Sequence, residues 1–136
     1  MPRKTDSDNP ADWLLFAGAD LETVRECLGN DCTFSVCQAK LAEAIEKLLK
    51  AELIRTGWTL LKTHDLEFLA SELRAREPDS AHDFDALLEP LDEAYFSGRY
   101  PGFDLEDPDW PVLRAQLAAI TALAEKIRSR LPPTSP

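Results

Sequence analysis

Apolar residues recur at steps of three and four along most of the chain, and polar residues fill the positions between them. The longest such stretch runs from about residue 33 to 56. Its apolar positions are Phe34, Cys37, Leu41, Ile45, Leu48, Leu49 and Leu53. This spacing is typical of a helix with a broad buried face. Because no Gly or Pro interrupts the stretch, we expect it to be the central helix against which the others pack.

Four further helices are predicted, over about 10–28, 64–76, 80–98 and 107–131. Asn9 followed by Pro10 is a helix-start signal. Thr63 and Ser80 are candidate caps for the third and fourth helices, and Gly57 is expected to end the central one.

Pro90 lies inside the apolar stripe of the fourth helix and predicts a kink or a break there. Pro78 is expected to stop the helix before it. The predicted fold is an all-α, up-and-down bundle of about five helices with short loops. A single domain is expected over 10–131, with flexible tails at 1–9 and 132–136.

The polar face of the central helix carries two acid–base pairs at a spacing of four, Glu43 with Lys47 and Glu46 with Lys50. Each has the glutamate on the N-terminal side, and such a pair stabilises a helix by about 0.2–0.5 kcal/mol. The two lysines could instead hold a phosphate. Because pairing fully accounts for their spacing, we favour the structural role.

Composition narrows the range of partners. The formal net charge is −10, which disfavours non-specific binding to nucleic acid. Three cysteines, spaced by five residues, match no closed disulfide framework and no metal motif. The chain shows neither a secretory signal nor an apolar run long enough to span a membrane. We therefore expect a cytoplasmic protein without a metal or another cofactor.

Three blocks along the chain resemble the HEPN domain family. EAIEKLLKA at 43–51 is similar to the family's helix signature, usually Q-A-x-E-K-x-L-K-A, with Glu43 where the family commonly has Gln. Thr63-His64-Asp65-Leu66 follows at the family's usual distance, and Arg99-Tyr100-Pro101 is similar to its R-Y-P element. Ala19-Asp20-Leu21 fits more weakly. With the first helix, the resemblance covers roughly residues 11–131.

The resemblance implies an up-and-down helical bundle, frequent homodimerisation and binding of a nucleotide or nucleic acid. It also implies pairing with a minimal nucleotidyltransferase encoded alongside. Many HEPN proteins cleave RNA with an Arg followed by a His after four to six residues. Arg76 and His82 match the bare spacing, but the intervening EPDSA is expected to be a loop that separates the two side chains. A catalytic role is therefore disfavoured, and no catalytic residue is assigned.

The candidate contacts for a nucleotide or a partner are His64, Arg99 and Tyr100, together with Lys47 and Lys50. His64 could make a structural hydrogen bond at a helix start or contact a phosphate or a base. Arg99 beside Tyr100 could stack on a base and bind a phosphate, or pair with a carboxylate while Tyr100 fills the core. The leading interpretation is a non-catalytic binding module for a nucleotide or a minimal nucleotidyltransferase. The alternatives are an RNA-cleaving HEPN toxin and an interaction module without a nucleotide.

Overall fold

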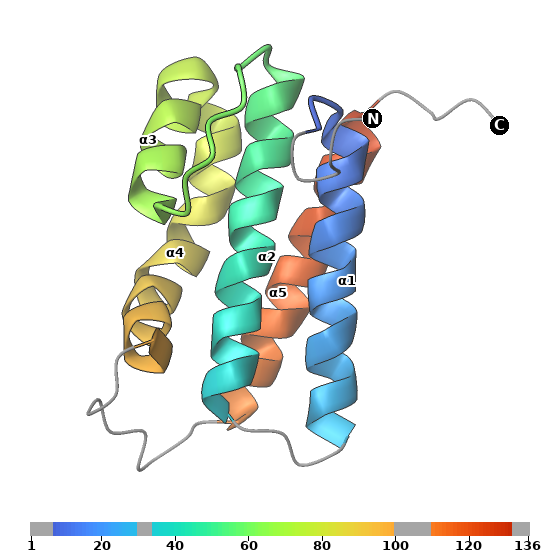
Figure 1. The fold of residues 1–136 in the computed structure, drawn as a ribbon, viewed down its shortest axis with the longest axis vertical. Coiled ribbons are helices and arrows are strands. Elements are labelled where there is room, and N and C mark those ends of the chain that lie inside the picture. Colours follow the sequence, from blue (N-terminus) through green and yellow to red (C-terminus); the bar gives the residue numbers. More distant parts are fainter. Residues whose placement is uncertain (1–6, 30–33, 100–109, 132–136) are drawn as a thin grey trace, which may run out of the picture.

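A computed structural model describes residues 7–29, 34–99 and 110–131, without the side chains of 89–99. The described residues form five helices and no strand, which confirms the predicted all-α fold (Figure 1). The helices are α1 (Pro10–Gly29), α2 (Phe34–Arg55), α3 (Leu66–Arg76), α4 (Pro78–Arg99) and α5 (Trp110–Arg130).

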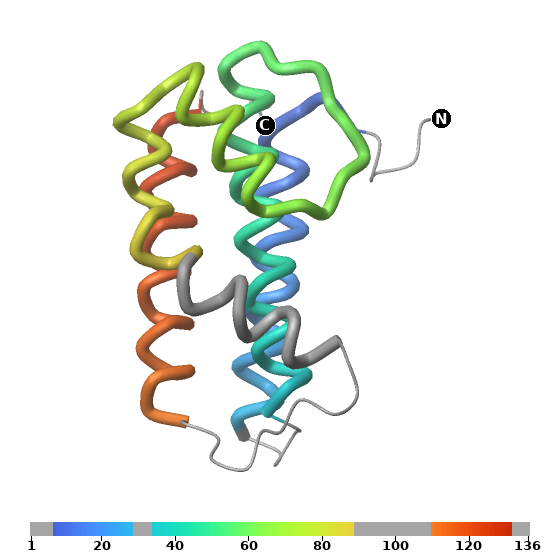
Figure 2. Tube along the Cα trace, turned by 90° about the vertical axis from the view of Figure 1, so that its left-hand side faces the viewer, coloured from blue at the N-terminus to red at the C-terminus, as the bar shows by residue number. Residues whose placement is uncertain are grey.

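The helices pack side by side along one long axis, and α2 contacts the other four (Figure 1). Helix α1 runs antiparallel to α2, and α4 runs antiparallel to α5. The connection 56–65 leaves the end of α2 and folds back along the bundle before α3 begins (Figure 2). Helices α2 and α3 therefore run in the same direction, and this is the one departure from simple up-and-down order among the described helices.

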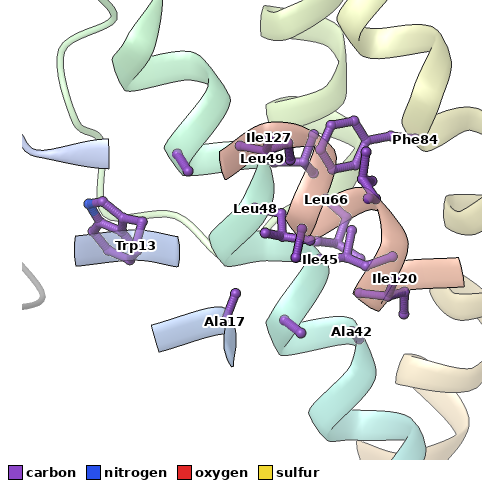
Figure 3. Packing of buried hydrophobic residues seen from close by; sticks show 14 of the residues in the cluster. Trp13, Ala17, Ala42, Ile45, Leu48, Leu49, Leu66, Phe84, Ile120 and Ile127 are labelled. Carbon is purple, nitrogen blue, oxygen red and sulfur yellow. The ribbon is translucent and has the colours of Figure 1, made fainter. Parts of the chain in front are cut away.

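Helix α2 is the central helix, as its apolar spacing predicts. Thirteen of its 22 residues are buried, so it is covered on nearly every side. Ile45, Leu48 and Leu49 pack with Phe84 of α4 and with Ile120 and Ile127 of α5, while Trp13 and Ala17 line the α1 side (Figure 3). The buried residues of this helix lie mainly between Leu41 and Ile54.

Two of the predicted helix ends have the expected geometry. The Asn9 side chain accepts a hydrogen bond from the Ala11 amide at 3.0 Å, and α1 begins at Pro10. Gly57 ends α2 with a φ of 94°, a conformation that glycine adopts without steric cost. The amide of Trp58 donates to the Leu53 carbonyl and that of Gly57 to the Ile54 carbonyl. This is the paired pattern of a Schellman motif.

Two predicted caps are wrong. Asp65, not Thr63, caps α3, and its carboxylate accepts from the Phe68 amide at 3.1 Å. Helix α4 begins at Pro78 and not after Ser80, because proline is well suited to a first helical turn, where its missing N–H is not needed.

The predicted break at Pro90 is not found, since α4 continues as one helix to Arg99. The kink that Pro90 also predicts remains a prediction.

Candidate functional site

The polar face of α2 is turned inward. Glu46 and Lys50 are only 6% and 3% exposed, and their side chains form an ion pair at 3.1 Å. The Lys50 ammonium also lies 5.1 Å from the ring centre of Trp13 on α1, within the range of a cation–π contact. The predicted Glu46–Lys50 pair therefore exists, but it is buried and not on a solvated face as its spacing suggests.

Lys47 reaches across to the neighbouring helix. Its ammonium lies 2.5 Å from a carboxylate oxygen of Asp20 on α1. Glu43, the predicted partner of Lys47, pairs with Lys40 at 3.2 Å. The Glu43–Lys47 prediction is thus wrong, because the buried carboxylate of Asp20 offers Lys47 a less solvated partner than the half-exposed Glu43.

His64 is fixed to the same helix from the connection between α2 and α3. Its Nδ1 lies 3.1 Å and 3.0 Å from the two carboxylate oxygens of Glu46. The ring is 72% exposed, while the Glu46 side chain is 8% exposed. His64 precedes α3, and its partner is a residue of α2 and not Thr63 or Asp65. The predicted structural hydrogen bond exists, but it links two elements.

These contacts leave the polar cluster on α2 electrically balanced. Lys40, Lys47 and Lys50 are matched by three carboxylates, those of Asp20, Glu43 and Glu46. For Lys40, burial opposes the charged form, but the hydrogen bond and charge of Glu43 and the charge of Asp20 raise its pKa above the usual value. Lys40 and Lys47 join α2 to α1 through Asp20, while Lys50 pairs within α2 and lies over Trp13 of α1. None of the three ammonium groups is left without a carboxylate.

Sequence reasoning missed Asp20 and Trp13 as members of this cluster. Asp20 is an acid inside the otherwise apolar buried stripe of α1, between Ala17, Leu21 and Val24. A buried acid requires a cation, so the position of Asp20 in the sequence already indicates that a cation lies near it. The choice of Lys47 as that cation depends on how α1 and α2 pack.

Arg99 and Tyr100 are not tested by the structure. Arg99 is the last residue of α4, but its side chain lies outside the described residues, as does the whole of Tyr100. Their predicted role in contacting a base and a phosphate remains a prediction.

Arg76 and His82 belong to two different helices, α3 and α4. The intervening segment is not a loop, because α3 ends at Arg76 and α4 starts at Pro78. His82 is 84% exposed and lies 3.4 Å from Asp85. Arg76 is exposed, and no hydrogen bond or ion pair joins it to His82 or to any other residue that the structure describes.

Glu52 is a second buried carboxylate of α2. Its side chain is fully buried. It accepts hydrogen bonds from Arg55 and, at 2.8 Å, from Arg130 at the end of α5. Arg55 also pairs with Glu77, and Arg130 with Asp83. This network ties the end of α2 to the α3–α4 junction and to the end of α5.

The acids and arginines of that network each favour the charged form of their partners, as the shifts of their pKa values show. The hydrogen bond from Arg55 is the main cause that lowers the pKa of Glu77. Burial opposes ionisation of Asp83, but hydrogen bonds from Arg130 and Lys126 outweigh it and lower its pKa. For both arginines burial opposes the charged form, and the carboxylates around them still raise their pKa.

An open groove of about 610 Å³ lies beside the end of α2. It is lined by Asp8, Ile54, Gly57, Trp58, Thr59, Leu60 and Lys62. Trp58, one of these lining residues, is itself buried. The volume is within the range of small-molecule sites, about 300–1,000 Å³.

Over the residues described, no cluster of three or more His, Cys, Asp or Glu side chains could hold a metal ion. None of the described helices is both long enough and apolar enough to cross a membrane.

Comparison with known proteins gives one family. The model of the HEPN domain matches residues 11–131, a range that includes all five helices except Pro10, the first residue of α1. Searches of curated proteins and of solved structures give no match. The matched range covers most of the chain and agrees with the all-α bundle and with the motif blocks at 43–51 and 63–66. The chain therefore belongs to the HEPN domain family.

Proposed function

We propose that this chain is a non-catalytic binding module whose ligand is a protein partner, a minimal nucleotidyltransferase. The observation that carries the proposal is the charge balance on α2. Each lysine that the sequence offered for a phosphate, Lys47 and Lys50, is engaged by a carboxylate of the bundle. Binding a phosphate there would require one of these ion pairs to break.

The overall charge supports the same choice. A chain with a formal net charge of −10 attracts a basic protein surface and repels a polyphosphate. His64, in contrast to the two lysines, combines a fixed ring with an exposed edge, so it can contact a partner without rearrangement. A non-catalytic role is supported by Arg76 and His82, which lie on separate helices without a contact between them.

A nucleotide is the second candidate, and the groove at the end of α2 favours it. The groove has the volume of a small-molecule site. Arg99 and Tyr100 belong to the same hypothesis as possible phosphate and base contacts. A homodimer is a further part of the proposal, since HEPN domains often pair with a second copy.

The decisive experiment mixes the purified chain with a minimal nucleotidyltransferase from the same organism and measures mass by size-exclusion chromatography with light scattering. We expect a complex that contains both proteins and is heavier than either one alone, and a dimer of this chain when it is alone. Titration calorimetry with ATP, GTP and AMP tests the second candidate. Heat with a nucleotide and no complex with the protein would replace the first proposal by the second. RNA cleavage that is lost in Arg76→Ala and His82→Ala would overturn the non-catalytic reading.

A further inference from the structure

The Glu46–His64 contact determines which ring nitrogen of His64 carries the proton. Nδ1 lies within hydrogen-bonding distance of both carboxylate oxygens. A carboxylate in an ion pair with Lys50 offers only acceptors. Nδ1 is therefore the donor, and in a neutral imidazole the proton is then absent from Nε2.

The lone pair on Nε2 makes His64 a hydrogen-bond acceptor at the surface. The ring is 72% exposed, and the described residues supply no hydrogen-bond partner for Nε2. Phosphate oxygens are themselves acceptors, so they do not match this nitrogen. The N–H groups of arginine and lysine do match it.

The charges beside His64 point to the same kind of ligand. Asp65 follows it directly and Glu67 lies in the first turn of α3, and both side chains are exposed. Two acids next to an acceptor attract a cationic donor and repel an anion. Of the two cations nearby, Lys50 is buried behind Glu46, and Lys62, two residues before His64, is exposed. The acids still outnumber the exposed cation at this surface.

We propose that His64 is a recognition residue that accepts a hydrogen bond, through Nε2, from an arginine or lysine side chain of the protein partner. Glu46 is the positioning residue that fixes the tautomer and the orientation of the ring. This assignment rests on the proposed function for its partner, but the tautomer itself is a property of the isolated chain.

His82 provides a matched control within the chain. It is the only other histidine, and its Nδ1 lies 3.4 Å from Asp85, whose side chain is 45% exposed. Solvent competes for that longer contact, so His82 is expected to show the tautomer mixture of a free histidine.

The first experiment records the nitrogen chemical shifts of both imidazole rings by long-range proton–nitrogen NMR at pH 8. We expect His64 to be mainly the Nδ1–H tautomer and His82 to be a mixture. In Glu46→Leu/Lys50→Met, which removes the carboxylate together with its ammonium, His64 should become a mixture like His82, while the amide spectrum shows a folded bundle. A shared tautomer pattern for the two histidines in the wild type, or no change in the double variant, would overturn the positioning role.

The second experiment measures affinity for the minimal nucleotidyltransferase by calorimetry. His64→Leu removes the acceptor and should weaken binding about tenfold, which corresponds to the loss of one charge-assisted hydrogen bond. His64→Gln, whose amide oxygen can replace Nε2 as acceptor, should restore affinity to within about threefold. His82→Leu should bind as the wild type does.

The two experiments fail separately. Wild-type affinity in His64→Leu, with a complex present, overturns the recognition role and leaves the proposed function intact. If the wild type forms no complex, the proposed function and the recognition role both fail, and the NMR result still decides whether Glu46 positions His64.

Discussion

Glu46 and Glu52 are buried carboxylates on the same helix, yet their surroundings differ in kind. Glu52 is held between the guanidinium groups of Arg55 and Arg130, which are held in turn by Glu77 and Asp83. Glu46 lies between the buried Lys50 and the exposed ring of His64. The Glu52 network connects helix ends, and the Glu46 contact connects the core to the surface.

The difference separates a structural role from a role in recognition. Both partners of Glu52 are arginines, which are permanently charged and donate their hydrogen bonds to carboxylates of the bundle. Few donors of this network are therefore left for a ligand. The partner of Glu46 on the surface uses one nitrogen for the bundle and leaves the other available. Substitutions around Glu52 are therefore expected to change mainly stability. Substitutions at His64, the surface partner of Glu46, are expected to change mainly binding.

The largest effect is expected for Glu52→Ala. Removing one member of a buried ion pair typically destabilises a protein by about 3–5 kcal/mol. We expect the lower end of that range, because Arg55 and Arg130 keep Glu77 and Asp83 as partners. Urea denaturation followed by circular dichroism measures the loss.

The control for this change is Glu125→Ala, which removes the exposed partner of Arg128. Exposed pairs contribute about 0.2–1 kcal/mol, so this variant should remain close to the wild type. Equal losses for Glu52→Ala and Glu125→Ala would show that the Glu52 network does not hold the helix ends together.

At the Glu46 position, a single change and a double change should differ in outcome. Lys50→Ala leaves Glu46 buried with only His64 as its partner, and we expect a loss of about 2–3 kcal/mol. Glu46→Leu/Lys50→Met replaces the pair by apolar side chains of similar size, which is often neutral or stabilising. Thermal unfolding of the two variants measures this contrast. A double variant less stable than Lys50→Ala would mean that the charges themselves are needed.

The positions of the helices were predictable from the sequence. Apolar residues at a period of three to four indicate a helix with a buried face, whichever helix packs against that face. The stripe of α2, the start at Pro10 and the turn at Gly57 all depend on local geometry, and the structure agrees with them. The ion pairs depend on which helix lies opposite. Lys47 pairs with Asp20 of α1, and no spacing within α2 indicates that choice.

The sequence indicated some residues of the site but not how they contact one another. His64 and Lys50 were named as separate candidates, and the structure joins them through Glu46. The polar spacing of Glu46 on α2 resembles that of a solvated face, yet its side chain is buried. The 56–65 connection folds back along the bundle (Figure 2) and brings His64 within hydrogen-bonding distance of it.

Acid should weaken the network around Glu52. The pKa values of Glu77 and Asp83 are lowered in the folded state. Their stabilising contribution is therefore complete above the unfolded pKa values of about 4 and is lost as pH falls through the lower, folded values. Because Glu77 is 39% exposed, solvent screening limits the effect to roughly 1 kcal/mol or less.

Urea midpoints measured from pH 6 to pH 3 test this dependence. In Asp83→Asn the slope of stability against pH should be shallower than in the wild type, since one carboxylate that must be protonated is gone. The same slope in both proteins would contradict the assigned role of Asp83.

The smallest effect on stability is expected at the residue proposed to matter most for binding. His64→Ala removes an exposed ring whose one polar contact with a described side chain is with Glu46, and Glu46 keeps Lys50 as its ion-pair partner. Contacts with such exposed groups typically contribute less than about 1 kcal/mol, and we expect a loss below about 0.5 kcal/mol. His82→Ala is the matched control, and both variants are compared with the wild type by thermal unfolding. A loss for His64→Ala as large as that for Lys50→Ala would mean that His64 anchors the 56–65 connection. In that case weaker partner binding by His64 variants would report a displaced connection and not a missing hydrogen-bond acceptor.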